Sequence, residues 1–278
     1  MSDTLVDVAT VGERLTDPDW AIVDCRHRLT EPDFGEAAYR ESHIAGAVFA
    51  HADRVLSGRP ATDRGRHPLP DPETLRGRFG ALGIDADTKV VAYDDAGGAI
   101  AGRLWWMLRY MGHRDAAVLD GGWPAWVAAG GATRGGEESR PARTFAGEPR
   151  REWLVTIDQV DAARRLVDSR EPARYRGETE PIDRVAGHIP GARSHHFAVN
   201  LGEDGRFLDP AALRERLERS LDGVPAGETV FYCGSGVSAC HNLLALAHAG
   251  LPAARLYVGS WSEWSSDPAR PVATGGNP

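Results

Sequence analysis

The feature that most constrains the fold is an internal duplication, because four segments of the first half recur in the same order in the second half. The paired segments are IVDCRH at 22–27 and LVDSRE at 166–171, SHIAGA at 42–47 and GHIPGA at 187–192, VVAYDD at 90–95 and TVFYCG at 229–234, and GHRDAAVLDGGWPAW at 112–126 and GLPAARLYVGSWSEW at 250–264. A period this long exceeds any solenoid repeat. The pattern therefore indicates that a whole domain has been duplicated.

Between the two copies lies a stretch rich in Gly, Arg and Glu with little apolar periodicity, which is typical of a linker that crosses the surface. We expect a first domain at 1–135, a linker at 136–152 and a second domain at 153–278.

Within each copy, short β-like runs alternate with helical stretches. The β-like runs are 21–24, 90–93 and 116–120 in the first copy and 166–168, 229–232 and 255–258 in the second. The helical stretches GRLWWMLRYMG and CHNLLALAHAG end on Gly112 and Gly250, where a C-terminal glycine belongs. The alternation predicts an α/β fold in which each domain is a doubly wound parallel sheet flanked by helices.

Composition narrows the classes of partner. The 278 residues include 32 Lys and Arg against 40 Asp and Glu, a formal net charge of −8, which argues against nucleic acid or an anionic membrane as the main partner. The opening MSDTLVDVATVGERLTDPDW lacks the features of a secretory signal, so we expect a cytoplasmic protein. Three cysteines without CxxC spacing make no disulfide framework and favour a reducing compartment.

One cysteine stands in a context that favours chemistry. Cys233 follows an apolar β-like run and precedes a glycine-rich loop and a helix, in the order VFYCGSGVSAC. We expect two glycines with positive φ to turn the N–H groups of the loop inward as an anion cradle, aided by the positive end of the helix. The cradle residues would be Gly234, Ser235, Gly236, Val237, Ser238 and Ala239. Such a site favours a thiolate nucleophile over the alternative of a small buried strand residue.

Other conspicuous residues are better explained by structure than by function. Cys25 and Cys240 are expected to be buried, and the repeated pairs Trp123 with Trp126 and Trp261 with Trp264 to pack in the cores. The repeated His43 and His188 are expected to make structural hydrogen bonds. The adjacent pair His195 and His196 lacks further ligands at metal spacing, so we expect a solvated loop pair and no metal site.

The chain resembles the tandem rhodanese family of sulfurtransferases over nearly its whole length, through GHIPGA, CGSGVSAC, GSWSEW, WWMLRYMGH and LDGGW. The resemblance implies two rhodanese domains, of which only the second carries the nucleophile, because Asp94 stands where Cys233 stands in the second copy. It implies that Cys233 takes a sulfane sulfur from a donor as a persulfide and passes it to cyanide or a thiol, thioredoxin being one candidate. No metal or organic cofactor is implied.

The resemblance also bears on the donor. The uncharged loop CGSGVSAC looks like that of the mercaptopyruvate sulfurtransferases, with Ser238 where that group usually has Thr, whereas thiosulfate rhodaneses carry basic residues there. Thiosulfate stays open as the alternative donor. Arg174 matches the arginine that binds the mercaptopyruvate carboxylate. The second such arginine is replaced by Ile182, and Arg184 is a candidate substitute two residues later.

Two further catalytic residues follow from the resemblance. Ser235 matches a serine proposed to assist proton movement. His67, in GRHPLP, looks like the histidine of the first domain that reaches the site across the domain interface. Asp53 and Asp63 compete as its acidic partner.

Two functions from other classes have less support in the sequence. A cysteine phosphatase needs an arginine six places after its nucleophile, and that place holds Ala239. A regulatory or binding module without activity fits the first domain, but the retained Cys233 and its glycine-rich loop argue against it for the second.

Overall fold

The computed structural model describes residues 4–61 and 63–276 and divides into two compact units. The first unit takes the described residues of Met1–Gly58, Pro70–Arg150 and Glu203–Phe207, and the second takes those of Arg59–Leu69, Arg151–Gly202 and Leu208–Pro278. The segment that carries His67 thus belongs to the second unit. The contiguous limits expected from the sequence, 1–135, 136–152 and 153–278, stay a prediction.

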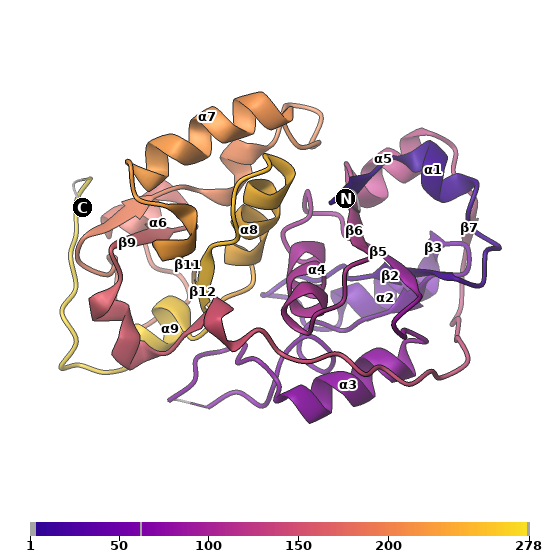
Figure 1. The fold of residues 1–278 in the computed structure, drawn as a ribbon, viewed down its shortest axis with the longest axis horizontal. Coiled ribbons are helices and arrows are strands. Elements are labelled where there is room, and N and C mark those ends of the chain that lie inside the picture. Colours follow the sequence, from indigo (N-terminus) through magenta and orange to yellow (C-terminus); the bar gives the residue numbers. More distant parts are fainter. Residues whose placement is uncertain (1–3, 62, 277–278) are drawn as a thin grey trace. The chain divides into compact units, whose positions relative to one another are not determined.

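The first unit contains a parallel sheet of five strands in the order β1-β6-β5-β2-β4 and a small antiparallel ribbon of β3 and β7 (Figure 1). Its strands are β1 (Leu5–Val6), β2 (Trp20–Asp24), β3 (His43–Ile44), β4 (Val48–Phe49), β5 (Lys89–Tyr93), β6 (Ala116–Leu119) and β7 (Thr133–Arg134). Its helices are α1 (Val8–Gly12), α2 (Phe34–Glu41), α3 (Pro72–Ala81), α4 (Ala101–Tyr110) and α5 (Gly122–Ala128).

The second unit contains a parallel sheet of five strands in the order β10-β9-β11-β12-β8. Its strands are β8 (Leu154–Val155), β9 (Arg165–Asp168), β10 (Ala192–Ser194), β11 (Thr229–Tyr232) and β12 (Arg255–Tyr257). Its α-helices are α6 (Pro172–Arg176), α7 (Pro210–Leu221), α8 (Ala239–His248) and α9 (Ser260–Trp264), and its 3₁₀ helices are Arg151–Trp153, Ile157–Ala162, Phe197–Asn200 and Ala226–Glu228.

The two sheets have the same topology, which agrees with the duplication. Reading the second sheet from β8 to β10 gives strands that match β1, β6, β5, β2 and β4 in turn. Every pairing within the two sheets is parallel. The predicted α/β fold, with parallel sheets flanked by helices in both halves, is therefore confirmed.

Helix boundaries follow from local chemistry. The carboxylate of Asp71 accepts a hydrogen bond from the Thr74 N–H at 2.9 Å, and Asp209 caps α7 in the same way. In both helices a proline occupies the first turn, where its missing N–H costs no intrahelical bond. Beyond α4 and α8, Gly112 and Gly250 have φ of 83° and 69°, so both predicted C-terminal glycines are confirmed.

Each sheet is covered on both faces. In the second unit α6 and α9 contribute Tyr175, Trp261 and Trp264 to a core cluster with Val230 and Tyr232 of β11. Because successive side chains of a strand point to opposite faces, Phe231 of β11 faces the layer of α7 and α8. The first unit repeats this arrangement, with α1 and α5 on one face and α4 against β5 and β6 on the other.

A buried ion pair recurs at the carboxyl end of the corresponding strands. Nε of Arg170 donates to both carboxylate oxygens of Asp168 at 3.0 Å, and Arg26 grips Asp24 in the same fork. Asp168 is fully buried and the Arg170 side chain is 1% exposed. Each guanidinium also lies over an indole, Arg170 over Trp261 at 4.6 Å. Each pair thus ties a strand end to the helix that carries the tryptophan.

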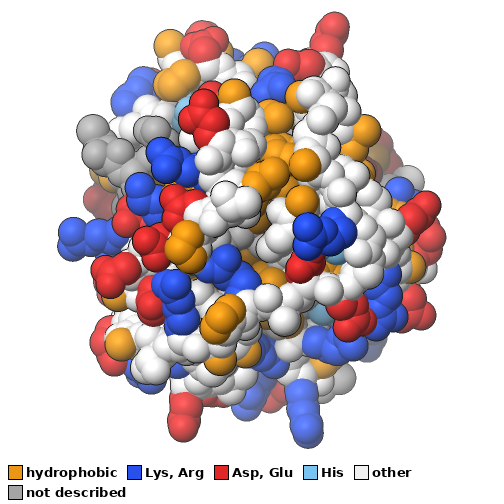
Figure 2. All heavy atoms as spheres, turned by 90° about the vertical axis from the view of Figure 1, so that its right-hand side faces the viewer, with side chains coloured by type: hydrophobic (Ala, Val, Ile, Leu, Met, Phe, Trp, Pro, Cys, Tyr) orange, Lys and Arg blue, Asp and Glu red, His pale blue; other side chains and the backbone are white. Residues whose placement is uncertain are grey.

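The surface mixes charges of both signs. On the face drawn in Figure 2, basic and acidic side chains of the described residues are interspersed with small apolar areas. In the described part of the chain, no helix combines the length and the apolar character needed to cross a membrane.

Candidate active site

Cys233 lies where the sequence places it, between the end of β11 and the start of α8. The residue is 2% exposed, and its Sγ accepts a hydrogen bond from the N–H of Gly236 at 3.1 Å. Its own N–H donates to Oγ of Ser260 at 3.1 Å, and its carbonyl accepts from the Trp261 N–H at 3.0 Å. The sulfur therefore sits inside the loop, and its backbone is fixed to the start of α9.

The two loop glycines have different roles, which corrects one expectation. Gly236 has a φ of 75°, and a side chain there would lie 2.4 Å from the carbonyl oxygen of Val258, so only glycine fits. Gly234 does not have a positive φ. A side chain on Gly234 would instead enter the space next to the guanidinium groups of Arg66 and Arg174. Glycine at this position leaves the space beside the two guanidinium groups open, and the backbone conformation there does not require glycine.

The first unit shows what a loop of this kind binds. Asp94 occupies the position of Cys233, and its carboxylate accepts hydrogen bonds of 2.7–2.9 Å from the N–H groups of Ala96, Gly98, Ile100 and Ala101. The loop between strand and helix thus wraps around a negative charge with four inward N–H groups. This carboxylate fills its own cradle. In the second unit the same point of the fold carries a thiol.

His67 and Ser235, which were predicted separately as site residues, lie in contact. Nδ1 of His67 lies 2.7 Å from Oγ of Ser235, in hydrogen-bond contact, and each residue is 7% exposed. Because Ser235 is two residues beyond Cys233, this histidine adjoins the loop that begins at Cys233. The segment Arg59–Leu69, although it comes from the first half of the sequence, packs within the second unit.

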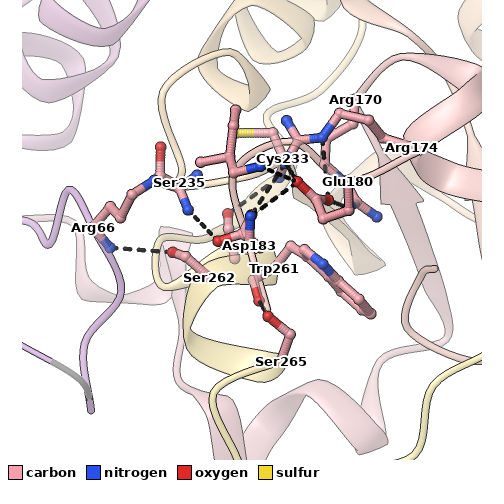
Figure 3. A network of polar contacts seen from close by, with 12 residues as sticks. Arg66, Arg170, Arg174, Glu180, Asp183, Cys233, Ser235, Trp261, Ser262 and Ser265 are labelled. Carbon is pink, nitrogen blue, oxygen red and sulfur yellow. Dashed lines mark hydrogen bonds and ion pairs between the residues drawn. The ribbon is translucent and has the colours of Figure 1, made fainter. Parts of the chain in front are cut away.

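Arginines and carboxylates form an ion-pair network beside the loop (Figure 3). Arg174 donates to Glu180 at 2.7 Å and to Asp183 at 3.1 Å, and Arg170 reaches Glu180 at 3.3 Å. Burial opposes the charged form of Glu180, yet the hydrogen bond from Arg174 and those from backbone N–H groups lower its pKa. The pKa of Asp183 is raised, because the effect of burial exceeds the opposing effect of the ion pair with Arg66.

Arg66 is a member of this network that the sequence analysis did not single out. Its Nη1 forms an ion pair with Asp183, and its backbone N–H donates to Oγ of Ser262 at 3.1 Å. The only available signal was its position before His67 in GRHPLP.

The structure does not bring Arg184 to this group. Arg184 is exposed and shares no hydrogen bond or ion pair with the described residues of the network. Ile182, at the position of the missing arginine, is 40% exposed.

The residues assigned to structure behave as expected, with one exception. Cys25 and Cys240 are fully buried, and Trp126, Trp261 and Trp264 lie in the cores. Trp123 is partly buried and packs against the core cluster of the first unit. His188 hydrogen-bonds the Tyr175 carbonyl at 2.7 Å, and His43 does the same with Tyr39.

The exception is His195, which was expected to be a solvated loop residue. It is only 5% exposed, and its ring nitrogens lie 2.6 Å from Oγ of Ser220 and 3.0 Å from Oδ1 of Asn200. These bonds satisfy the buried imidazole, and burial lowers its pKa. The neighbouring His196 is only partly buried.

Comparison with known proteins gives a consistent result. The family model described as "Rhodanese-like domain" matches residues 7–129 and 152–267. A Pseudomonas aeruginosa protein named "Probable 3-mercaptopyruvate sulfurtransferase" is 49% identical over 99% of both chains. The thiosulfate sulfurtransferase of Cricetulus griseus is 35% identical over 91% of this chain and 85% of its own. The structure of 3-mercaptopyruvate sulfurtransferase from Leishmania major is similar with a TM-score of 0.86 at 33% identity, over 95% of this chain and 74% of that one.

Ser260 provides a test of how the loop is held. It has a φ of 54°, where the first unit has Gly122 with the same φ, and its Oγ accepts the Cys233 N–H. Ser260→Ala removes the acceptor and keeps the backbone strain, so we expect the free energy of unfolding to fall by about 1–3 kcal/mol. Ser260→Gly loses the same bond but relieves the strain, and should be about 1 kcal/mol more stable than the alanine variant.

Denaturant unfolding of both variants and the unsubstituted protein, followed by tryptophan fluorescence, measures these differences. An alanine variant as stable as the glycine variant would contradict the strain argument. Two variants as stable as the unsubstituted protein would contradict the role of the hydrogen bond.

Proposed function

Because this chain belongs to the rhodanese family, we propose that it is a sulfurtransferase that moves a sulfane sulfur from 3-mercaptopyruvate to a thiophilic acceptor through a persulfide on Cys233. The observation that carries the proposal is the position of the Cys233 sulfur inside a loop whose counterpart in the first unit wraps a carboxylate. Such a loop stabilises the negative charge that the sulfur carries before attack and again as a persulfide.

The first half-reaction is an attack of the Cys233 thiolate on the donor sulfur. The new S–S bond forms as the C–S bond of 3-mercaptopyruvate breaks, and the electron pair of that bond leaves on carbon as the enolate of pyruvate. A proton then converts the enolate into pyruvate. We assign the delivery of this proton to Ser235, a residue of the loop whose Oγ lies 2.7 Å from Nδ1 of His67.

The second half-reaction returns the enzyme to its starting state. Cyanide or a thiol attacks the outer sulfur of the persulfide, the S–S bond breaks, and its electron pair returns to Cys233 as thiolate. With cyanide the product is thiocyanate. Because the two half-reactions share one covalent intermediate, the kinetics are ping-pong.

The network beside the loop is the proposed site for the anionic end of the donor. Arg174 lies there with a guanidinium that can hold a carboxylate through two parallel hydrogen bonds. The uncharged loop favours mercaptopyruvate, the donor in the name of the Pseudomonas aeruginosa relative. Thiosulfate, the donor in the name of the Cricetulus griseus relative, is the second candidate.

The acceptor and the compartment are proposed on chemical grounds. A small thiol or the dithiol of thioredoxin supplies the nucleophile for the second half-reaction, with cyanide as a laboratory substitute. Cys25, Cys233 and Cys240 form no disulfide, which fits a reducing compartment, and we place the protein in the cytoplasm.

Replacement of the nucleophile tests the proposal. We expect Cys233→Ser to lose thiocyanate formation from both donors, because a serine hydroxyl forms no persulfide. Cys25→Ala, which removes a buried thiol of the first unit, should keep activity. Steady-state kcat/KM for 3-mercaptopyruvate and thiosulfate, with cyanide as acceptor, measures both. Formation of thiocyanate by the Cys233→Ser protein would contradict the proposal.

Replacement of Ser235 should affect the reactions of the two donors differently. The enolate released from mercaptopyruvate needs a proton, whereas the sulfite released from thiosulfate leaves as a stable anion. Loss of a general acid costs about 10²–10⁴-fold in rate. We therefore expect Ser235→Ala to lower kcat in that range for mercaptopyruvate and much less for thiosulfate. Equal losses with the two donors would show that Ser235 acts on the loop and not on the leaving group.

A further inference from the structure

We propose that a depression between α7 and the segment after β10 is a binding site for a small oxyanion with the chemistry of sulfate or phosphate, and that His195 takes up a proton when the anion binds. The depression has a volume of about 330 Å³, and its lining consists of His195, Val199, Arg216, Arg219 and Ser220. These residues all belong to the second unit and lie outside the network around Arg174. The inference therefore goes beyond the proposed sulfurtransferase function.

The lining of the depression carries positive charge and no carboxylate. Arg216 forms no ion pair within the described part of the chain, and its Nη1 donates to the carbonyl of Val199. Arg219 donates to Glu215 at 2.6 Å, but the two side chains of this pair are 62% and 76% exposed, and such exposed pairs are weak. Because guanidinium groups bind oxyanions through charge-assisted hydrogen bonds, this lining suits an oxyanion.

Ser220 and His195 supply polar groups beside the two arginines. Oγ of Ser220 lies 2.6 Å from Nδ1 of His195, and Nε2 of the same ring lies 3.0 Å from Oδ1 of Asn200. An amide oxygen only accepts hydrogen bonds, so Nε2 carries the proton of the neutral ring and Nδ1 accepts from the Ser220 hydroxyl. An anion that accepts the same hydroxyl proton leaves Nδ1 without a donor, which favours a second proton on the ring.

The charges around His195 favour the same coupling. The charged and titratable groups near the ring are Arg216 and Arg219 of α7, the neighbouring His196 and, beyond Asn200, His241 of α8. Burial lowers the pKa of His195, and Arg216, His196 and Arg219 lower it further. An oxyanion in the depression offsets the charge of the arginines and therefore raises this pKa. By linkage, the anion binds more tightly as the pH falls.

A chain of buried hydrogen bonds holds the imidazole in place. Nδ2 of Asn200 donates to Oδ1 of Asn242 at 2.6 Å, and Nδ2 of Asn242 donates to Oγ of Ser169 at 2.9 Å. The N–H of Ser169 in turn donates to the carbonyl of Tyr232 at 2.8 Å. Because Asn200 also contacts the imidazole, the floor of the depression is preorganised, and its hydrogen bonds reach the end of β11, the strand that leads to Cys233.

The duplication shows that the fold does not require a histidine at this point. Ala50 is the counterpart of His195, because the N–H of Ala50 donates to the carbonyl of Asp24 at 2.9 Å and that of His195 donates to the carbonyl of Asp168 at 2.8 Å. Ala50 is fully buried. The same place in the fold thus accepts an apolar side chain, so packing alone does not explain the buried histidine of the second unit.

The experiment titrates sodium sulfate into the full chain at constant ionic strength and follows the backbone amide resonance of Ser220 by NMR. A resonance in the depression distinguishes this site from sulfate bound elsewhere. We expect saturable shifts in the unsubstituted protein. Arg216→Met should weaken sulfate binding by about ten- to hundredfold, because a charge-assisted hydrogen bond is lost. Arg214→Met, the matched control on α7 outside the lining, should leave the dissociation constant unchanged.

A second variant guards against a general loss of structure in Arg216→Met. Arg219→Met removes an exposed side chain, so it should fold normally and weaken sulfate binding as well. Shifts that grow without saturation, equal dissociation constants for Arg216→Met and Arg214→Met, or unchanged binding in Arg219→Met would overturn the proposal. The titration involves no sulfur donor, so its result does not depend on the proposed sulfurtransferase function.

The pH dependence of sulfate binding tests the part of His195. Sulfate stays a dianion near neutral pH, and we expect it to bind about tenfold more tightly at about pH 6 than at about pH 8. His195→Gln keeps a hydrogen-bonding side chain that takes up no proton, so it should bind sulfate equally at both pH values. An affinity of the unsubstituted protein that does not change with pH, or a pH dependence that persists in His195→Gln, would overturn proton uptake by His195.

Discussion

The buried pair of Asp168 and Arg170 is the interaction on which the geometry of the second unit depends. Arg170 donates to Asp168 at the end of β9, to the carbonyl of Gly187 and to Glu180, and it lies over Trp261. A strand end, the segment before β10 and helix α9 are thereby joined through one guanidinium. Breaking such a buried pair by removing one partner costs about 3–5 kcal/mol, because the other charge stays buried and uncompensated.

The residues around Cys233 are connected to this pair through hydrogen bonds and ion pairs. Glu180, held by Arg170, also accepts from Arg174, and Arg174 reaches the space beside Gly234. Arg170 also contacts helix α9 through the indole of Trp261. The backbone N–H of Trp261 in turn donates to the carbonyl of Cys233. The arginine network and the loop that begins at Cys233 are therefore both connected to one buried charge pair.

The duplication shows how one framework serves two purposes. The first unit keeps the buried pair Asp24 with Arg26, the indole contact and the loop between strand and helix, but Asp94 fills that loop with its own carboxylate. Four inward N–H groups are thereby used for structure. In the second unit the sulfur of the smaller Cys233 accepts one hydrogen bond from the loop, from the N–H of Gly236. We propose that the other N–H groups of that loop stabilise a persulfide on Cys233.

The sequence predicted most of the fold, because the relevant signals are local or repeated. The apolar runs at 90–93 and 229–232 fall within β5 and β11, and both C-terminal glycines have positive φ. Motif order and resemblance singled out Cys233, Ser235 and His67, and the structure brings Ser235 and His67 into contact.

What sequence analysis missed depends on tertiary contacts. The burial of His195 requires Ser220 and Asn200 as partners, and the role of Gly234 requires guanidinium groups beside it. The position of Arg66 depends on a segment of the first half packing within the second unit. No periodicity or composition encodes such contacts.

The most direct test of the central claim is the mass of the intact protein after incubation with 3-mercaptopyruvate and no acceptor, followed by peptide mapping. Our account predicts a gain of one sulfur atom, located on Cys233, that disappears on addition of cyanide with release of thiocyanate. No gain in mass with either mercaptopyruvate or thiosulfate, or a sulfur found on Cys25 or Cys240, would contradict it.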